Sequence, residues 1–252
     1  MLKKLALVAA VFAGVGTAHA YQAEVGASLA YIDPDSADSI VGFAVDGTYY
    51  FNPVQIKNSP LNEAAFLNRA SNVNANFGYA SNDDVKLYNF GLGAEFFIPD
   101  SDLYARVNFS HNEAEHGFGS FSVDTELQTY SAEIGYLPTP GLLLAAGLSG
   151  WDNDVEDGID PTLRAKFVGP FGNNNVNLEA YIGFGDLDEF RLQADYYINR
   201  SLSIGADYYD NDAVDEFGLN IKKFINTQTS LEARVGFADA EDNFSLRAAY
   251  RF

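Results

Sequence analysis

The sequence lacks the features of several common protein classes. It contains no cysteine, so no disulfide framework can form. Basic residues are scarce, with 15 Lys and Arg against 35 Asp and Glu, and the resulting net charge of −20 argues against nucleic acid as a partner. No apolar run reaches the ~20 residues of a membrane-spanning helix. Walker, dinucleotide and zinc-ligand spacings are also missing. What remains is a chain rich in glycine and aromatic residues.

The first residues have the composition of a secretory signal peptide. Lys3 and Lys4 precede the apolar run "LALVAAVFAGVG", and Ala18-His19-Ala20 forms an A-x-A cleavage site. The run is too short for a membrane anchor. We therefore predict a cleaved signal peptide over residues 1–20, export from the cytoplasm, and a mature chain over 21–252.

The last stretch, Ser230 to Phe252, alternates strictly between two kinds of residue. Leu231 and Val235, and later Leu246 and Tyr250, alternate with charged residues, glycine or other small residues. A period of two predicts strands. A strand with a continuous apolar face and a charged opposite face fits a barrel whose outside meets lipid and whose inside meets water.

Alternating segments recur along the whole mature chain. They are expected at 21–32, 40–51, 72–80, 85–98, 102–111, 122–136, 140–151, 160–169, 175–185, 189–198, 201–210, 215–225, 229–238 and 242–252. This pattern predicts an all-β, transmembrane, antiparallel up-and-down barrel of about 14 strands, with 12 or 16 as alternatives. A soluble β-sandwich is the competing fold.

The connections between these segments alternate between two kinds. Short ones such as "PDSD" and "PTPG" have turn chemistry. The others, "DPDSADS", "NDD", "HNEAEHG", "DNDVEDGID", "DLDE", "DNDAVDE" and "ADAEDN", hold 22 of the 35 acids and no Lys or Arg. An up-and-down barrel places every second connection at one end, so we predict one acidic rim, facing outward from the cell. A sandwich would scatter these acids.

One segment, Asn52 to Ser71, interrupts the pattern where a short turn was due. Ser59 is a candidate N-cap with Pro60 at the first helical position, and apolar residues follow at helical spacing. We predict a short helix near 59–69. It either folds into the mouth of the barrel, where Lys57, Glu63 and Arg69 would form a constriction, or covers the barrel base from outside.

The stretch "YFNPV…SPLNEAAFLNRASNVNANFGY", the signal peptide, the hairpins with aromatic turns and the terminal "AAYRF" together resemble the porin family of Gram-negative, gammaproteobacterial outer-membrane β-barrel proteins. The resemblance covers the whole mature chain and implies a passive channel without naming a solute. The final Phe252 also resembles the signal that the barrel assembly machinery recognises in such proteins.

Charged residues on the polar strand faces are predicted to line the lumen. The cations are Arg106, Arg164, Lys166, Arg191, Lys222, Arg234, Arg247 and Arg251, and the acids are Glu24, Asp46, Glu95, Glu133, Glu179, Asp195, Asp207 and Glu232. Eight of each sign leave this wall neutral. Glu179 with Arg191 and Glu232 with Arg247 are expected to pair across strands. Inward glycines such as Gly26, Gly91 and Gly205 are expected to leave space inside.

These features predict an outer-membrane porin for passive diffusion of small hydrophilic solutes or ions, mildly cation-preferring because of the acidic rim. The alternative is a closed or structural barrel that serves adhesion or scaffolding. Further expected partners are lipid and lipopolysaccharide, the latter through divalent cations.

We expect no enzyme, no catalytic residue, no cofactor and no metal site. His111 and His116 share a loop but have no nucleophile beside them. "DNDVEDGID" has Asp157 where a calcium loop needs glycine, so only weak calcium binding is expected there.

Overall fold

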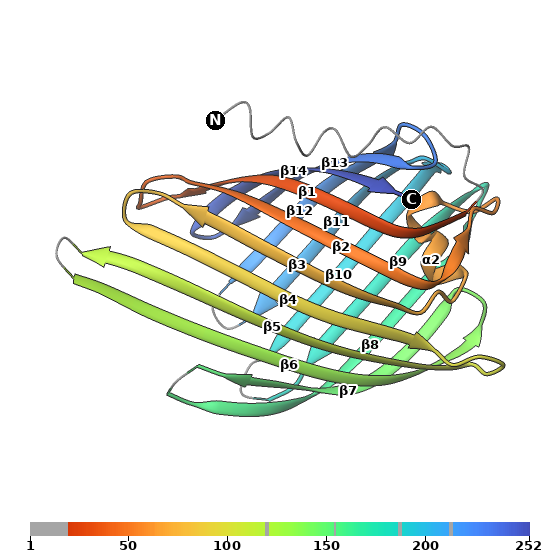
Figure 1. Ribbon diagram of the computed structural model, residues 1–252, viewed down its shortest axis with the longest axis horizontal. Coiled ribbons are helices and arrows are strands. Elements are labelled where there is room, and N and C mark those ends of the chain that lie inside the picture. Colours follow the sequence, from red (N-terminus) through yellow and green to blue (C-terminus); the bar gives the residue numbers. More distant parts are fainter. Residues whose placement is uncertain (1–19, 119–120, 154, 186–187, 212–213) are drawn as a thin grey trace.

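The computed structural model is a closed barrel of fourteen antiparallel strands (Figure 1). The structure describes residues 20–118, 121–153, 155–185, 188–211 and 214–252. The predicted signal peptide therefore falls, except for Ala20, outside the described residues. The strands are β1 Ala20–Pro34, β2 Ile40–Gln55, β3 Asn72–Ser81, β4 Val85–Phe97, β5 Leu103–Phe118, β6 Phe121–Thr139, β7 Leu142–Asp152, β8 Asp157–Phe171, β9 Asn174–Gly183, β10 Glu189–Asn199, β11 Leu202–Asn211, β12 Asp215–Phe224, β13 Thr229–Ala238 and β14 Glu241–Arg251.

Each strand pairs with its sequence neighbours, and β1 pairs with β14 to close the sheet. Large apolar side chains on one face of the strands point outward: Leu231 and Leu246 are each 48% exposed and Ile134 is 74% exposed. In a sandwich these residues would fill a shared interior. The closed order of fourteen strands confirms the predicted barrel and its number of strands, and the outward apolar face rules out the sandwich.

The two ends of the barrel differ in the length of their connections. The described residues of the seven predicted acidic segments lie at one end, here called the loop end, and the short turns lie at the other, the short-turn end. Several acidic segments are strand where loops were expected. The stretch 111–117 in particular belongs to β5, which continues to Phe118 and pairs in register with β6. Cross-strand hydrogen bonding extends this hairpin beyond the point where the apolar alternation ends.

Two apolar clusters lie inside the barrel at its short-turn end. One cluster joins Tyr21, Tyr50 and Val54 to Ala64 and Ala70. A second comprises Phe97, Tyr104, Leu137 and Leu143, with Phe66 packed against it. Both clusters include residues of the predicted helical segment, so that segment completes an apolar core inside the barrel.

The helical segment is shorter than expected. A 3₁₀ helix spans Leu61–Glu63 and α2 spans Ala64–Leu67, and no side chain caps either of them. Ser59 is thus not the predicted N-cap, because the first helix begins after Pro60. Figure 1 shows α2 at the same end of the barrel as the C terminus. Within the described residues, no helix has the length and apolarity needed to cross a membrane.

Candidate functional site

Residues 56–70, here called the mouth segment, lie within the short-turn mouth and contact strands on several sides of it. Arg251 of β14 donates from Nη1 to the Leu61 carbonyl at 2.7 Å, and the Leu61 amide donates to the Arg200 carbonyl at 2.8 Å. On the other side the ring of Phe66 packs edge-on against Phe97 of β4 at 6.3 Å between centroids. Of the two placements predicted for this segment, the structure has the one inside the mouth.

Glu63 fixes the mouth segment to the inner wall. Its carboxylate is 4% exposed, accepts a 2.6 Å hydrogen bond from the Tyr197 hydroxyl and lies 3.2 Å from the Lys166 ammonium. Tyr197 belongs to β10 and Lys166 to β8, so both partners come from the wall opposite β2, which leads into the segment. The buried carboxylate therefore ties the segment to the far side of the barrel.

The three residues predicted to form a constriction do not lie together. Only Glu63 reaches the interior. Arg69 turns to the β4–β5 connection, where its guanidinium bonds the Asp102 carboxylate at 2.9 Å. Lys57 is exposed, and its carbonyl accepts a hydrogen bond from Arg200. The prediction was wrong for Arg69 and Lys57 because spacing along the chain does not specify which way a short irregular segment turns.

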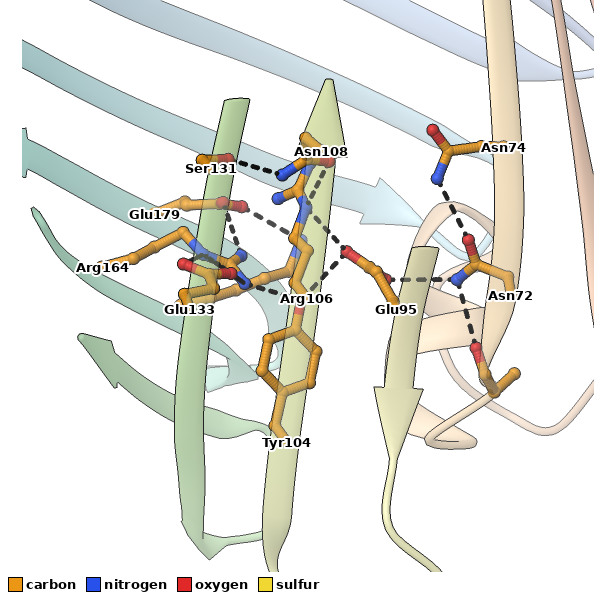
Figure 2. A network of polar contacts seen from close by, with 12 residues as sticks. Asn72, Asn74, Glu95, Tyr104, Arg106, Asn108, Ser131, Glu133, Arg164 and Glu179 are labelled. Carbon is orange, nitrogen blue, oxygen red and sulfur yellow. Dashed lines mark hydrogen bonds and ion pairs between the residues drawn. The ribbon is translucent and has the colours of Figure 1, made fainter. Parts of the chain in front are cut away.

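Arg164 organises a buried polar network beside the mouth segment (Figure 2). Its guanidinium pairs with the Glu133 carboxylate at 2.5 Å and with the Glu179 carboxylate at 3.1 Å, and it donates to the Tyr104 hydroxyl at 2.9 Å. The Arg164 side chain is 7% exposed. Lys166 then links Glu179, at 3.3 Å, to Glu63. Five charged residues thus alternate in sign across the interior.

A cavity of about 1040 Å³, here called the vestibule, lies on the loop-end side of this network. Arg164, Glu133 and Glu179 are among its lining residues, whereas Lys166 and the mouth segment are not. The charged network therefore lies between the vestibule and the segment that fills the mouth. The vestibule is polar and large enough for a small hydrophilic solute.

One sector of the vestibule wall carries amides and hydroxyls in place of charges. Asn76 donates to Asn89 at 2.5 Å, Asn89 to Asn112 at 2.7 Å, and Asn108 to Ser131 at 3.1 Å (Figure 2 shows the last). We did not predict this sector. Its signal is present in the polar positions of "NVNANF" and "NFSHNE", which recur at every second residue and so share the inner face.

All sixteen predicted lumen charges lie on the strand faces opposite the exposed apolar side chains. Each of the eight cations has a carboxylate within ion-pair distance. Seven of the eight acids likewise have a cation. Asp195 is the exception among the described residues, since its hydrogen bonds come from Asn177 and Gln193.

The two predicted cross-strand pairs are wrong in their partners. Arg191 lies opposite Tyr181, pairs with Glu189 and contacts the Tyr181 and Tyr209 rings. Glu232 does lie opposite Arg247 in register, but it pairs with Lys222 at 3.1 Å. Glu189 is two residues from Arg191 on the same face of β10, and Lys222 lies directly opposite Glu232 on β12, as Arg247 does on β14. Each inward charge therefore has neighbours on its own strand and on both adjacent strands, and the sequence alone does not specify which of them it pairs with.

Inward glycines accommodate neighbouring side chains more than they create open space. A Cβ at Gly26 would lie 2.5 Å from both Arg247 Nη2 and Asp46 Oδ1, and one at Gly91 would lie 2.2 Å from Asn76 Oδ1. The expectation of free space over these glycines was wrong. Long polar side chains fold over them, which is how an ion pair fits inside a barrel of this width.

Acidic residues face one another in register at the loop end. Five cross-strand positions oppose two carboxylates: Asp33 and Asp242, Glu113 and Glu126, Glu115 and Asp124, Asp152 and Asp157, Asp210 and Asp215. Three further rim acids, at positions 154, 186 and 212, lie outside the described residues. The alternating topology thus gathers the described rim carboxylates at one end, as the charge pattern predicted.

Neither of the minor candidate sites is assembled. His111 and His116 both lie on β5, and because they are five residues apart they occupy opposite faces of that strand. They do not form a pair. Within the described part of the chain, no group of three or more His, Cys, Asp or Glu could hold a metal ion.

Comparison with known proteins identifies the family. Residues 2–159 match the family described as "Putative general bacterial porin". The chain belongs to this family. It is also similar to Omp33, an outer-membrane protein of Acinetobacter baumannii, with 28% sequence identity, 93% of this chain and 99% of that chain covered, and a TM-score of 0.71. The family and this similarity locate the protein in the outer membrane.

More distant barrels share less with it. The KdgM porin in complex with disordered oligogalacturonate is 8% identical, with 91% of this chain and 99% of that chain covered and a TM-score of 0.49. A loop-deletion mutant of OmpT from Vibrio cholerae is 10% identical, with 91% and 98% covered and a TM-score of 0.44. Comparison with curated protein sequences finds no match.

Proposed function

We propose that this porin is an outer-membrane channel for small hydrophilic solutes or ions that is held closed at its short-turn end by the mouth segment. The observation that carries the proposal is that a polar vestibule ends where the buried Glu63 carboxylate holds the mouth segment against the inner wall. The vestibule leads from the loop end to the Arg164 network, and Glu63 fixes the mouth segment directly behind it. Passage then requires the mouth segment to move.

A mild cation preference is the second part of the proposal. The lumen charges considered above balance, so selectivity has to arise at the rim. Acids that face acids there repel one another and attract mobile cations. The effect should fade with salt, because the Debye length falls to about 10 Å at 0.1 M.

Replacement of the mouth segment tests the closure. In one variant, residues 57–69 are exchanged for a short Gly/Ser turn, and single-channel conductance in a planar bilayer is compared with that of the wild type. We expect a large, steady conductance increase. The matched control is Lys57→Ala, which changes an exposed residue of the same segment and should leave the conductance at the wild-type value.

Reversal potentials under a salt gradient test the selectivity of the opened variant. Cation preference at low salt that declines at high salt is expected. Anion preference at low salt would contradict the proposal for the rim while leaving the channel itself intact.

The alternative function is a closed or structural barrel for adhesion or scaffolding. The number of strands that the mouth segment contacts favours it, because each contact opposes opening. If the Gly/Ser variant folds as a barrel by circular dichroism and still does not conduct, the structural function is the better account.

The remaining sequence expectations complete the proposal. Residues 1–20 act as the cleaved export signal. The exposed ring of Phe252, which stacks on Tyr250, is available to the barrel assembly machinery. The rim acids bind lipopolysaccharide phosphates through divalent cations. No catalytic residue and no cofactor are proposed.

A further inference from the structure

Asp195 is a buried acid whose charge has no fixed counterpart. The residue is 5% exposed, and no Lys, Arg or His in the described chain forms an ion pair with it. Asn177 Nδ2 at 3.0 Å and Gln193 Nε2 at 2.8 Å both donate to the same oxygen, Oδ2. The Oδ1 oxygen leans over Gly205, where a Cβ would approach it to 2.2 Å. A buried carboxylate with only amide partners is costly unless something neutralises it.

Asn177 supplies a second observation at the same place. The residue is 1% exposed, and its Oδ1 has no hydrogen-bond donor among the described residues. Rotating the amide by half a turn would not help, because its oxygen would then face the Asp195 carboxylate. Since Oδ1 and Nδ2 belong to one planar amide, this bare acceptor is held within a few ångströms of Asp195. Buried acceptors without donors are rare and call for a water or an ion.

The surroundings carry an excess of negative charge. Glu133, Arg164, Glu179, Lys166 and Glu63 alternate in sign and end on a carboxylate at both ends, so three acids face two cations. Asp195 adds a fourth acid, on the same face of β10 as Tyr197, the hydrogen-bond partner of Glu63. Among these six residues, four acids and two cations, two negative charges are therefore not matched by a cation. A bound cation from solution would compensate part of this negative charge.

We propose that a hard monovalent cation, Na⁺, binds between Asn177 Oδ1 and the Asp195 carboxylate. Carboxylate and amide oxygens suit hard cations. A divalent ion is a poorer fit, because Ca²⁺ takes about 6–8 oxygen ligands and Mg²⁺ needs near-octahedral coordination. Among the described residues, no group of three or more His, Cys, Asp or Glu is arranged to hold a metal ion, so Asp195 has no second acid to share one with.

The site lies next to the Tyr197–Glu63 hydrogen bond that holds the mouth segment. Tyr197, which bonds Glu63, is two residues from Asp195 on the same face of β10. A bound cation lowers the repulsion between Asp195 and Glu63 and so stabilises the docked mouth segment. The site stands on its own geometry and does not depend on whether solutes cross the barrel.

The first test is thermal unfolding of the detergent-purified barrel in NaCl and in choline chloride at equal ionic strength. Choline is too large to enter a buried oxygen site. We expect a higher Tm in Na⁺, saturating with concentration, and no such difference in Asp195→Asn. Crystals soaked in Tl⁺ should show an anomalous peak beside Asn177 Oδ1 in the wild type and none in Asp195→Asn.

Asn177→Asp distinguishes an ion from a water. With a cation bound, the added carboxylate becomes a stronger ligand, so the Tm difference between Na⁺ and choline should exceed that of the wild type. Asn175→Asp makes the same change two residues along the same face of β9 and should not increase it. Equal destabilisation of Asn177→Asp in both salts would indicate a water and overturn the proposal.

A proton is the remaining competitor. If the Tm depends on pH but is identical in Na⁺ and choline at every pH, and no Tl⁺ peak appears, then Asp195 is protonated in place of being cation-bound. That result would also overturn the proposal. Neither outcome bears on the conductance of the mouth-segment variant, so the two proposals can fail separately.

Discussion

The two ends of this barrel treat carboxylates in opposite ways. At the loop end, Glu113 and Glu126 oppose each other on neighbouring strands with no guanidinium between them, and both are partly open to solvent. At the short-turn end, Glu133 and Glu179 share the Arg164 guanidinium and the Glu63 carboxylate is almost fully covered. Water and dissolved ions screen the first arrangement. The second is tolerated because protein groups replace that screening.

This contrast shows which carboxylates depend on particular partners for the stability of the barrel. Acids at the rim can be exchanged with little consequence for the barrel, because their interactions are weak and screened. Each buried acid near the mouth segment has particular partners, so removing one partner leaves an uncompensated charge. The change in stability caused by a substitution should therefore be larger where the affected carboxylate is more buried.

The largest effect is expected for Arg164→Met. The change leaves Glu133 and Glu179 buried together without their shared cation, and breaking such a pair costs roughly 3–5 kcal/mol. Denaturant unfolding in detergent, followed by far-UV circular dichroism, measures it. Arg191→Met is the control: that guanidinium is 61% exposed, and its loss should cost only about 0–1 kcal/mol. Equal losses would remove the distinction between the two environments.

An intermediate effect is expected for Tyr197→Phe. The buried Glu63 carboxylate loses its 2.6 Å donor and keeps Lys166, which costs about 1–3 kcal/mol. Because the lost contact holds the mouth segment, the loss should appear as faster amide hydrogen exchange in α2, with exchange in β10 nearly unchanged. Tyr196→Phe, on the outer face of the same strand, should leave α2 as protected as in the wild type.

The smallest effect is expected for Glu126→Gln at the rim. Relief of the repulsion from Glu113 should stabilise the β5–β6 hairpin by a few tenths to about 1 kcal/mol at low salt. Hydrogen exchange of the hairpin amides at low and high salt measures the gain. Asp38→Asn, which changes an acid outside the strand register, should give no gain in that hairpin. A gain of the same size in high salt would show that repulsion is not its cause.

The barrel itself could be predicted because its evidence is local. Leu231 and Leu246 face lipid and Glu232 and Arg247 face inward as a direct result of a two-residue period. The acidic rim follows from the same kind of evidence, since antiparallel neighbours return every second connection to one end. Strand ends were less predictable: in the stretch 111–117, polar residues continue as strand because β6 supplies backbone partners.

The site was only partly predictable because its contacts are remote in sequence. The sequence alone determined which side chains point inward, through the period of the strands. Only the tertiary structure decided which of them meet: Glu63 finds Tyr197 and Lys166, Arg251 finds the Leu61 carbonyl, and Glu179 takes Arg164 and Lys166 over Arg191. Closure and stagger of the barrel, together with the apolar packing that draws the mouth segment inward, set those distances, and no local pattern encodes them.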